Sequence, residues 1–184
     1  IVSASGGVMI VALLLTMVCC IVLGMGVPTT ATYCIMAATC APILMSPDIG
    51  VEMLAAHFFV FYFGIVADIT PPVALAAYAG AAIAKAGPMK TAFNASRLAI
   101  AAFIVPYIIA MNPAMLFINT TIPEVVMITI TSIIGIFGVA AGLSGFVFRD
   151  MKWWERILCI VGGLTLLVPG SLTDLIGLVL VGAV

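Results

Sequence analysis

The chain has 184 residues, of which 65% are hydrophobic and 7% are charged, and its formal net charge is −1. A soluble domain carries about 25% charged residues, so this composition excludes a soluble globular protein and indicates an integral membrane protein. The six Lys and Arg residues form no basic patch, which excludes a nucleic-acid-binding protein. The first residues already lie in an apolar segment, and we expect the chain to be the C-terminal part of a longer polypeptide.

The first predicted element, residues 7–45, is an apolar segment that is interrupted near its middle. Two apolar arms, 7–24 and 31–45, flank the stretch Gly-Met-Gly-Val-Pro-Thr-Thr that begins at Gly24. Pro28 lacks a backbone N–H, and two glycines disfavour a regular helix. The pattern predicts a helix, a break and a second helix, either as one kinked span or as a re-entrant hairpin. We favour a hairpin that enters the membrane from outside.

The second predicted element, residues 53–84, is an apolar helix that is broken by Asp-Ile-Thr-Pro-Pro starting at Asp68. The two prolines lack N–H groups, so the carbonyls of Ala67 and Asp68 are expected to lose their helical partners. Thr70 is expected to cap the second half of the helix, with Pro71 at its first position. A carboxylate at this depth costs about 2.5–3.5 kcal/mol on insertion scales, which indicates a functional residue.

The remaining elements alternate between basic loops and apolar segments. We expect a basic loop with an amphipathic end at 85–97, a span at 98–117 with kinks at Pro106 and Pro113, and a glycine-rich span at 125–148. A second basic loop is expected at 149–156, where Trp153 and Trp154 provide an interfacial anchor. Residues 157–184 are interrupted by Pro169-Gly170-Ser171 and are expected to form a helix–turn–helix.

The charges predict an orientation. All six Lys and Arg residues lie in the loops 85–97 and 149–156, which the positive-inside rule assigns to the cytoplasm. The acidic loop 46–52 and the connection 118–124 are then expected outside.

Each break brings a helix C-terminus, with free carbonyls, close to a helix N-terminus, with free N–H groups. Such a break can bind a cation through carbonyls, threonine hydroxyls and Asp68, and the same architecture can present N–H groups to an anion. Paired discontinuous helices are typical of secondary transporters built from inverted repeats. The candidate substrate- and ion-binding residues are Gly24, Gly26, Pro28, Thr29, Thr30, Asp68, Thr70 and Pro71.

Structural interpretations of the same residues remain open. Asp68 could be a protonated carboxyl that is bonded to a neighbouring helix, and the threonines could only cap helices. His57 is interpreted as a polar interface residue rather than as a proton relay to Asp68, because about three helical turns separate the two. The five cysteines lie in apolar runs without a CxxC spacing, so we interpret them as small hydrophobic residues.

Three motifs carry a family resemblance: Gly-Met-Gly-Val-Pro-Thr-Thr-Ala from Gly24, Ala56-His57, and Asp-Ile-Thr-Pro-Pro-Val-Ala-Leu from Asp68. Together they resemble the second half of the large membrane subunit of TRAP (tripartite ATP-independent periplasmic) transporters, over about residues 14–117. The tail from Trp153 resembles the extension of fused small-plus-large permeases.

The resemblance implies an elevator-type, sodium-coupled importer of a small organic anion such as a carboxylate, with Asp68 and Thr70 as candidate sodium ligands. It implies a multi-pass protein of a bacterial or archaeal cytoplasmic (inner) membrane. The implied partners are the N-terminal repeat of the same permease, a small membrane subunit or its fused equivalent, a periplasmic solute-binding protein and membrane lipid. No cofactor other than the coupling ion and no nucleic acid is implied.

The expected fold is therefore an all-α integral membrane bundle that contains a re-entrant hairpin and a discontinuous transmembrane helix. Residues 1–117 would form the C-terminal repeat of the transporter core, with the hairpin 7–45, the broken helix 53–84 and the helix 98–117. Residues 118–184 would add further membrane helices.

Two other classes of function fit the sequence less well. An intramembrane enzyme such as a protease would need a Ser/His or paired-Asp arrangement, whereas this chain has one mid-membrane Asp and no GxSxG motif. A purely structural subunit would not need two proline breaks with polar residues at the membrane centre, since such features reduce stability.

Overall fold

The computed structural model describes residues 2–118, 120–147, 149–167 and 170–184, and this part of the chain is helical and contains no β-strand. It forms two compact units, residues 1–110 and 111–184, which are described separately below. The α-helices in chain order are α1 (Val2–Ser5), α2 (Met9–Gly24), α3 (Thr29–Thr39), α4 (Ala41–Leu44), α5 (Met53–Val66), α6 (Leu75–Ile83), α7 (Pro88–Leu98), α8 (Ile100–Met111), α9 (Ile122–Ser144), α10 (Trp153–Thr165) and α11 (Ser171–Gly182). Two short 3-10 helices are η1 (Ala67–Ile69) and η2 (Pro113–Leu116).

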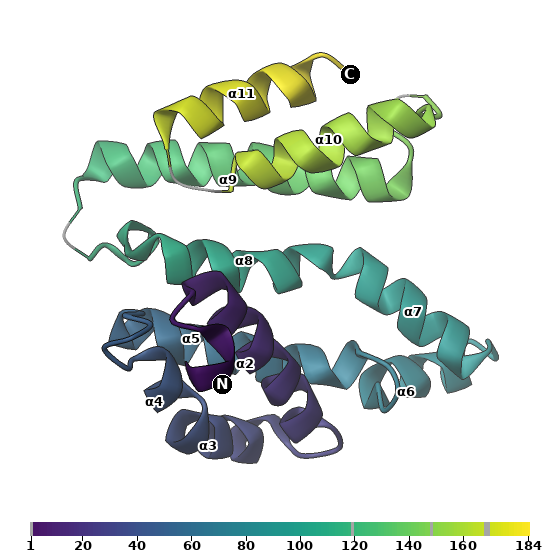
Figure 1. Cartoon of the computed structure of the whole chain (residues 1–184). Helices are drawn as coiled ribbons and strands as arrows, with labels where there is room; N and C mark the ends of the chain where they lie inside the picture. Colours follow the sequence, from purple (N-terminus) through teal and green to yellow (C-terminus); the bar gives the residue numbers. More distant parts are fainter. Residues whose placement is uncertain (1, 119, 148, 168–169) are drawn as a thin grey trace. The chain divides into compact units, whose positions relative to one another are not determined.

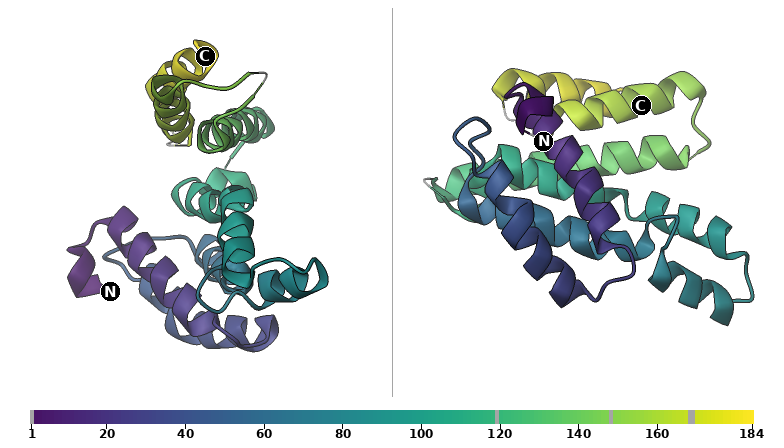
Figure 2. Two further views of the ribbon diagram at one scale, coloured as in Figure 1. Left: turned by 90° about the vertical axis from the view of Figure 1, so that its right-hand side faces the viewer. Right: turned by 60° about the horizontal axis from the view of Figure 1, so that its bottom comes forward.

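Helices α2 and α3 form a helical hairpin, which confirms the expected helix, break and helix. Figure 2 shows the two helices meeting at the turn between Gly24 and Thr29. At the open end of the hairpin, a Cβ added to Gly7 would lie 3.9 Å from the carbonyl oxygen of Asp48, so the segment before α2 approaches the loop after α4. A short helix, α4, extends the second arm. Whether the hairpin is re-entrant in a membrane stays a prediction.

Helix α5 is the centre of the first unit, because it packs against both α2 and α3. Its side chains Phe59 and Phe63 have no exposed surface, and their rings contact Tyr107 of α8 at centroid distances of 5.2 and 5.9 Å. Edge-to-face packing of this kind adds to the burial of large apolar rings. The hairpin therefore packs on an apolar helix whose buried aromatic side chains also contact α8.

The segment 53–84 is interrupted where expected, with α5 and η1 before the break and α6 after it. Helix α7 then packs back on α6 through a cluster of small residues, Ala74, Ala77 and Ala92. The sequence-based prediction of a basic loop at 85–97 was wrong, because Pro88 occupies the first turn of α7 and begins a helix there.

The expected span 98–117 was also too long. Helix α8 continues through Pro106 but ends at Met111, and Pro113 starts the separate helix η2. Helices α7 and α8 together form a segment that is bent by 41° at the break between Leu98 and Ile100.

The second unit is a bundle of α9, α10 and α11, in which α10 runs back along α9 and α11 runs back along α10 (Figure 1). Glycines allow the close approach that the sequence predicted for the span at 125–148. A Cβ on Gly163 of α10 would lie 2.6 Å from the carbonyl oxygen of Gly135 of α9, which only glycine can avoid.

The observed limits of the second unit's helices correct two expectations and confirm a third. Helix α9 begins at Ile122 and ends at Ser144, so it starts and stops a few residues earlier than expected. The expected basic loop 149–156 is shorter, because α10 begins at Trp153. The helix–turn–helix at the end is confirmed, although Pro169 of its expected interruption lies outside the described residues.

One described helix, α9, is long and apolar enough to cross a membrane, and the bent pair α7–α8 would be a second span if counted as one. The helices of the hairpin and of the broken segment are apolar but shorter than 18 residues. Large hydrophobic side chains are widely exposed, including Ile83 at 86% and Leu98 at 87%. This surface is compatible with a helical membrane bundle.

Candidate functional site

The two breaks lie against each other in the first unit. A Cβ on Gly24, at the end of α2, would lie 2.9 Å from the Cβ of Ala67 in η1 and 3.4 Å from the carbonyl oxygen of Gly64. A Cβ on Gly26 would lie 4.0 Å from a methyl carbon of Val73. The tip of the hairpin thus touches the broken helix on both sides of Asp68, and Gly24 permits this contact because it has no side chain.

The hairpin tip is held by a threonine that the sequence analysis missed. Thr32 is 1% exposed, its hydroxyl donates to the carbonyl of Val27 at 3.2 Å, and its N–H donates to the carbonyl of Pro28 at 2.9 Å. Its methyl group lies between Gly24 and Gly64, where a Cβ on either glycine would be 3.2 Å away. No pattern in the sequence distinguishes Thr32 from its neighbours, because its role depends on the glycine of another helix.

The predicted residues Thr29 and Thr30 occupy the first turn of α3, as expected. Both side chains are exposed, and neither hydroxyl makes a hydrogen bond in the part of the chain that the structure describes. Pro28 is the N-cap residue and supplies no side-chain acceptor, so the first N–H groups of α3 also lack a side-chain cap. The interpretation that these threonines only cap the helix therefore has no support in the geometry.

Thr70 does not cap α6, which corrects the sequence-based prediction. Its hydroxyl donates backwards to the carbonyl of Val66 at 2.7 Å, and its N–H donates to the carbonyl of Ala67 at 3.3 Å. Thr70 thus closes the end of η1, and the carbonyl of Ala67 has a partner after all. The 3-10 turn supplies this partner, because it pairs each carbonyl with the N–H three residues later and so avoids Pro71.

Pro71 is not the first residue of a helix either. The chain continues through the Pro71–Pro72 pair, whose peptide bond is cis, and α6 begins only at Leu75. The residue before it, Ala74, has a left-handed backbone with φ of 37°. Two successive prolines cannot donate the N–H groups that would extend the helix, so the break is longer than predicted.

Two further carbonyls of the break accept hydrogen bonds from side chains that the sequence analysis did not single out. The hydroxyl of Ser96 in α7 donates to the carbonyl of Ile69 at 3.0 Å, and the hydroxyl of Tyr78 in α6 donates to the carbonyl of Pro72. Ser96 is 27 residues away from its partner along the chain, so no local pattern could reveal this contact. The break is therefore a defined conformation and not an unstructured gap.

Asp68 is the exception at the break, because two of its acceptor groups lack protein partners. The residues three and four positions later are Pro71 and Pro72, which have no N–H, so its carbonyl has neither a 3-10 nor an α-helical partner. Its carboxylate is half-exposed and makes no hydrogen bond or ion pair with any residue that the structure describes. The alternative in which a neighbouring helix of this unit binds the carboxyl group finds no such contact.

The break borders an open cavity of about 600 Å³. Its lining residues are Thr70, Pro71, Pro72, Met89, Phe93 and Ser96. Of the two predicted sodium ligands, Thr70 lines this cavity, whereas Asp68, two residues earlier in the chain, is not among the lining residues. Among the described residues, no group of three His, Cys, Asp or Glu side chains could hold a metal ion. Unwound carbonyls and hydroxyls are the ligands that sodium uses in discontinuous helices.

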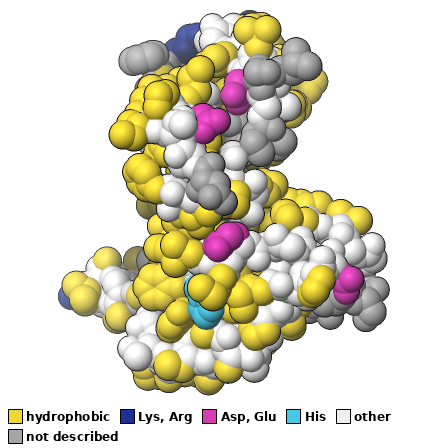
Figure 3. Space-filling view, turned by 90° about the vertical axis from the view of Figure 1, so that its left-hand side faces the viewer, with side chains coloured by type: hydrophobic (Ala, Val, Ile, Leu, Met, Phe, Trp, Pro, Cys, Tyr) yellow, Lys and Arg dark blue, Asp and Glu magenta, His cyan; other side chains and the backbone are white. Residues whose placement is uncertain are grey.

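His57 lies away from this junction. Its ring nitrogen Nδ1 is 3.1 Å from the hydroxyl of Tyr33 in α3, and Tyr33 also stacks edge-on against Phe61 at 5.8 Å. These side chains, with Leu54 and Phe58, line an open pocket of about 310 Å³. Figure 3 shows this single histidine on a largely hydrophobic surface. The geometry agrees with a polar residue that ties α3 to α5.

Comparison with known proteins gives two matches along the chain. Residues 1–125 match the family model described as "Tripartite ATP-independent periplasmic transporter, DctM component". Residues 125–177 match a domain of unknown function, DUF3394. No curated protein and no solved structure matches the chain. The first match covers the whole first unit with both breaks, and the second covers most of α9, all of α10 and the first half of α11.

Proposed function

The chain belongs to the family of the DctM component, the large membrane component of tripartite ATP-independent periplasmic transporters, and from this premise we propose that it is half of a sodium-coupled permease core. The cargo that we propose is a small organic anion such as a carboxylate. The family is one of transporter components and not of enzymes. The observation that supports coupling most strongly is the unpaired carbonyl and carboxylate of Asp68 at the junction of the two breaks.

We infer the cation site from the donors at this junction. Asp68 contributes its carboxyl oxygens and a free carbonyl, and Thr70 contributes a hydroxyl whose oxygen can still accept. A carboxylate inside a membrane protein is unfavourable unless it is paired. No described residue of this unit pairs with Asp68, so a bound cation would lower the free-energy cost of placing the carboxylate there. Sodium coupling stays a proposal that this geometry supports.

The anion site that we propose lies at the hairpin tip. The first N–H groups of α3 are not capped by a side chain, and the hydroxyls of Thr29 and Thr30 beside them are exposed. A helix N-terminus with free N–H groups attracts a carboxylate, because the helix dipole is positive there. Contact between Gly24 and Ala67 joins this tip to the break at Asp68, so a bound cation and a bound anion would stabilise each other.

The whole assembly would include the other repeat of the permease, the small membrane subunit or its fused equivalent, and a periplasmic solute-binding protein. The expected location is the bacterial inner membrane, with the basic segments 85–97 and 149–156 on the cytoplasmic side. An elevator-type movement of the hairpin and the broken helix remains part of this proposal.

The proposal is tested by solute uptake into proteoliposomes that contain the full-length permease, with its solute-binding protein outside. An inward sodium gradient is expected to drive accumulation of a carboxylate from a small panel, and an equal potassium gradient is not. Accumulation that is equal with either cation, or with no gradient, would overturn sodium coupling.

A further inference from the structure

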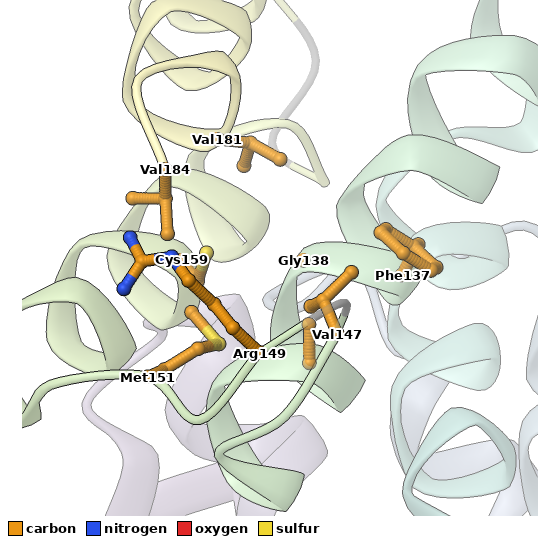
Figure 4. A pocket seen from close by; sticks show the side chains of 9 residues that line it. Phe137, Gly138, Val147, Arg149, Met151, Cys159, Val181 and Val184 are labelled. Carbon is orange, nitrogen blue, oxygen red and sulfur yellow. The ribbon is translucent and has the colours of Figure 1, made fainter.

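The second unit contains a cavity that is separate from the two breaks. It has a volume of about 420 Å³ and lies between α9, the loop after it, α10 and the end of α11 (Figure 4). Eight of its nine lining residues are uncharged and mostly apolar, and the ninth is Arg149. The nine are Phe137, Gly138, Ala141, Val147, Arg149, Met151, Cys159, Val181 and Val184. A pocket of this size with apolar walls and one polar group is typical of sites for small amphiphilic molecules.

Arg149 forms an ion pair that leaves most of its N–H donors available. Its Nη2 atom donates to Oε1 of Glu155 at 2.8 Å, and its side chain is still 60% exposed. Glu155 itself is 3% exposed and accepts a second hydrogen bond from the N–H of Lys152 at 2.8 Å. A guanidinium group carries five N–H donors, so the bond to Glu155 leaves most of them for an anion. Figure 4 shows the Arg149 side chain extending along the cavity towards Val184.

The neighbouring cations differ in what they contact. The guanidinium of Arg156 donates to the carbonyls of Gly142 and Leu143, at 2.9 and 3.0 Å, and so closes the end of α9. Lys152 is exposed and directly precedes α10. Arg149 therefore offers positive charge at the cavity, and Lys152 is a second exposed cation three residues later in the chain, while Arg156 has a structural partner.

The residues around the cavity indicate its depth in the membrane. The loop that carries Arg149 follows α9, the described helix that is long and apolar enough to span a bilayer. Trp153 and Trp154, just after the loop, are 75% and 43% exposed. Tryptophans beside Lys and Arg at the end of a span are typical of the level of the lipid headgroups. An occupant that enters from this level has a charged head and an apolar tail.

We propose that this cavity binds one anionic phospholipid, with part of an acyl chain among the apolar side chains and the phosphate on Arg149, next to Lys152. A guanidinium group binds phosphate through two parallel hydrogen bonds. A zwitterionic or neutral lipid binds less tightly, because its net attraction to the guanidinium group is smaller. This assigns a ligand to the part of the chain that matches the domain of unknown function, and it does not depend on the proposed transport activity.

The experiment measures lipid retention by native mass spectrometry of the full-length permease in detergent. The probes are phosphatidylglycerol, phosphatidylcholine and oleate, each added at the same concentration. One variant, Arg149→Gln with Glu155→Gln, removes both partners of the ion pair together, so no unpaired charge is left. The other, Val147→Phe, fills the cavity from a half-buried loop position. The controls are Lys90→Gln in α7 and Val161→Phe on the exposed side of α10, neither of which lines the cavity.

The wild-type protein and both controls are expected to retain phosphatidylglycerol about tenfold more strongly than phosphatidylcholine, because both lipids carry a phosphate but only phosphatidylglycerol has a net negative charge. The charge variant should lose this preference, and the filled variant should retain little of either lipid. Equal retention of phosphatidylglycerol in all proteins would overturn the proposal. Equal retention of both phospholipids by the wild type would also overturn it, as would a preference for oleate. If Val147→Phe does not fold, the wild-type lipid preference and the charge variant still decide.

Discussion

Gly24 is the residue at which the two breaks depend on each other. Alanine there would place a Cβ 2.9 Å from the Cβ of Ala67, which requires the hairpin and the broken helix to move apart. We expect Gly24→Ala to cost about 1–3 kcal/mol, as overpacking usually does, and to lower solute uptake severely. Uptake per folded transporter in proteoliposomes measures this.

The matched control is Gly80→Ala in α6, where an added Cβ would have no neighbour within 4 Å. A helical glycine in open space tolerates alanine and gains up to about 1 kcal/mol from it. Uptake should therefore stay normal in this control. Equal uptake by both alanine variants would show that the contact between the breaks is not needed.

Glu155 provides a pH-dependent contribution to the stability of the second unit. The hydrogen bond from Arg149, and then that from the Lys152 N–H, lower the pKa of Glu155 below its usual value of 4.5. A carboxyl group with a lowered pKa in the folded protein stabilises the fold fully above its unfolded pKa, and this contribution is lost as the pH falls through the folded-state pKa.

Thermal unfolding of the wild type and of the double variant Arg149→Gln/Glu155→Gln should therefore differ by a constant amount above about pH 5. The difference should shrink as the pH falls below about 4, because protonated Glu155 no longer accepts from a cation. A difference that stays constant down to pH 3 would show that the ion pair does not stabilise the fold.

At the residue scale, the sequence located the breaks correctly but not all of their chemistry. Asp68 was identified because a carboxylate next to two prolines has an evident cost in a membrane. Thr70 was assigned to the wrong helix, because the local pattern cannot distinguish a hydroxyl that bonds backwards from one that bonds forwards. Thr32 and Ser96 were missed, since their partners depend on how separate helices pack.

At the scale of elements, Ser96 links helix α7 to the break. Its hydroxyl donates a hydrogen bond to the carbonyl of Ile69 at 3.0 Å. Ser96→Ala should reduce stability by about 1 kcal/mol and make the break less well defined. We expect weaker sodium dependence of uptake, whereas Asn94→Ala, an exposed change in the same helix, should have no effect. If both variants keep the wild-type sodium dependence, Ser96 has no role in positioning the break.

Helices α9 and α10 depend on glycine in the same way as the hairpin does. A Cβ on Gly163 would meet the carbonyl oxygen of Gly135 at 2.6 Å and Val139 at 2.8 Å, and these are mostly backbone atoms that cannot move aside. Gly163→Ala should lower the free energy of unfolding by about 1–3 kcal/mol. The unfolding temperature of the protein should fall accordingly. Gly182→Ala, at the end of α11 with no neighbour within 4 Å, is the control and should be neutral. Similar unfolding temperatures for the two variants would contradict the close packing of α9 on α10.

Apolar length and proline positions predicted which elements exist, but not where each one ends. The segment 85–97 was expected to be a basic loop with only an amphipathic end, whereas the chain is helical from Pro88 to Leu98. The end of α8 at Met111 was missed because the residues after it are as apolar as those before it. Hydrophobicity alone does not mark a helix end within an apolar run, since the end depends on turns and on neighbours.

On the scale of the whole molecule, the chain combines a unit that carries both breaks with a second, glycine-packed helical unit. The family match covers the first unit, and the second extends into a domain without an assigned function. Composition predicted a membrane protein, and the paired breaks predicted a transporter.

The measurement that tests the account most directly compares Asp68→Asn with Asp48→Asn in sodium-driven uptake by the full-length permease. Asp48 is exposed in the loop between the hairpin and α5 and serves as a matched carboxylate. We predict that Asp68→Asn abolishes uptake or removes its dependence on sodium, while Asp48→Asn leaves both unchanged. A folded Asp68→Asn protein with wild-type uptake and sodium dependence would contradict the account and place coupling elsewhere in the permease.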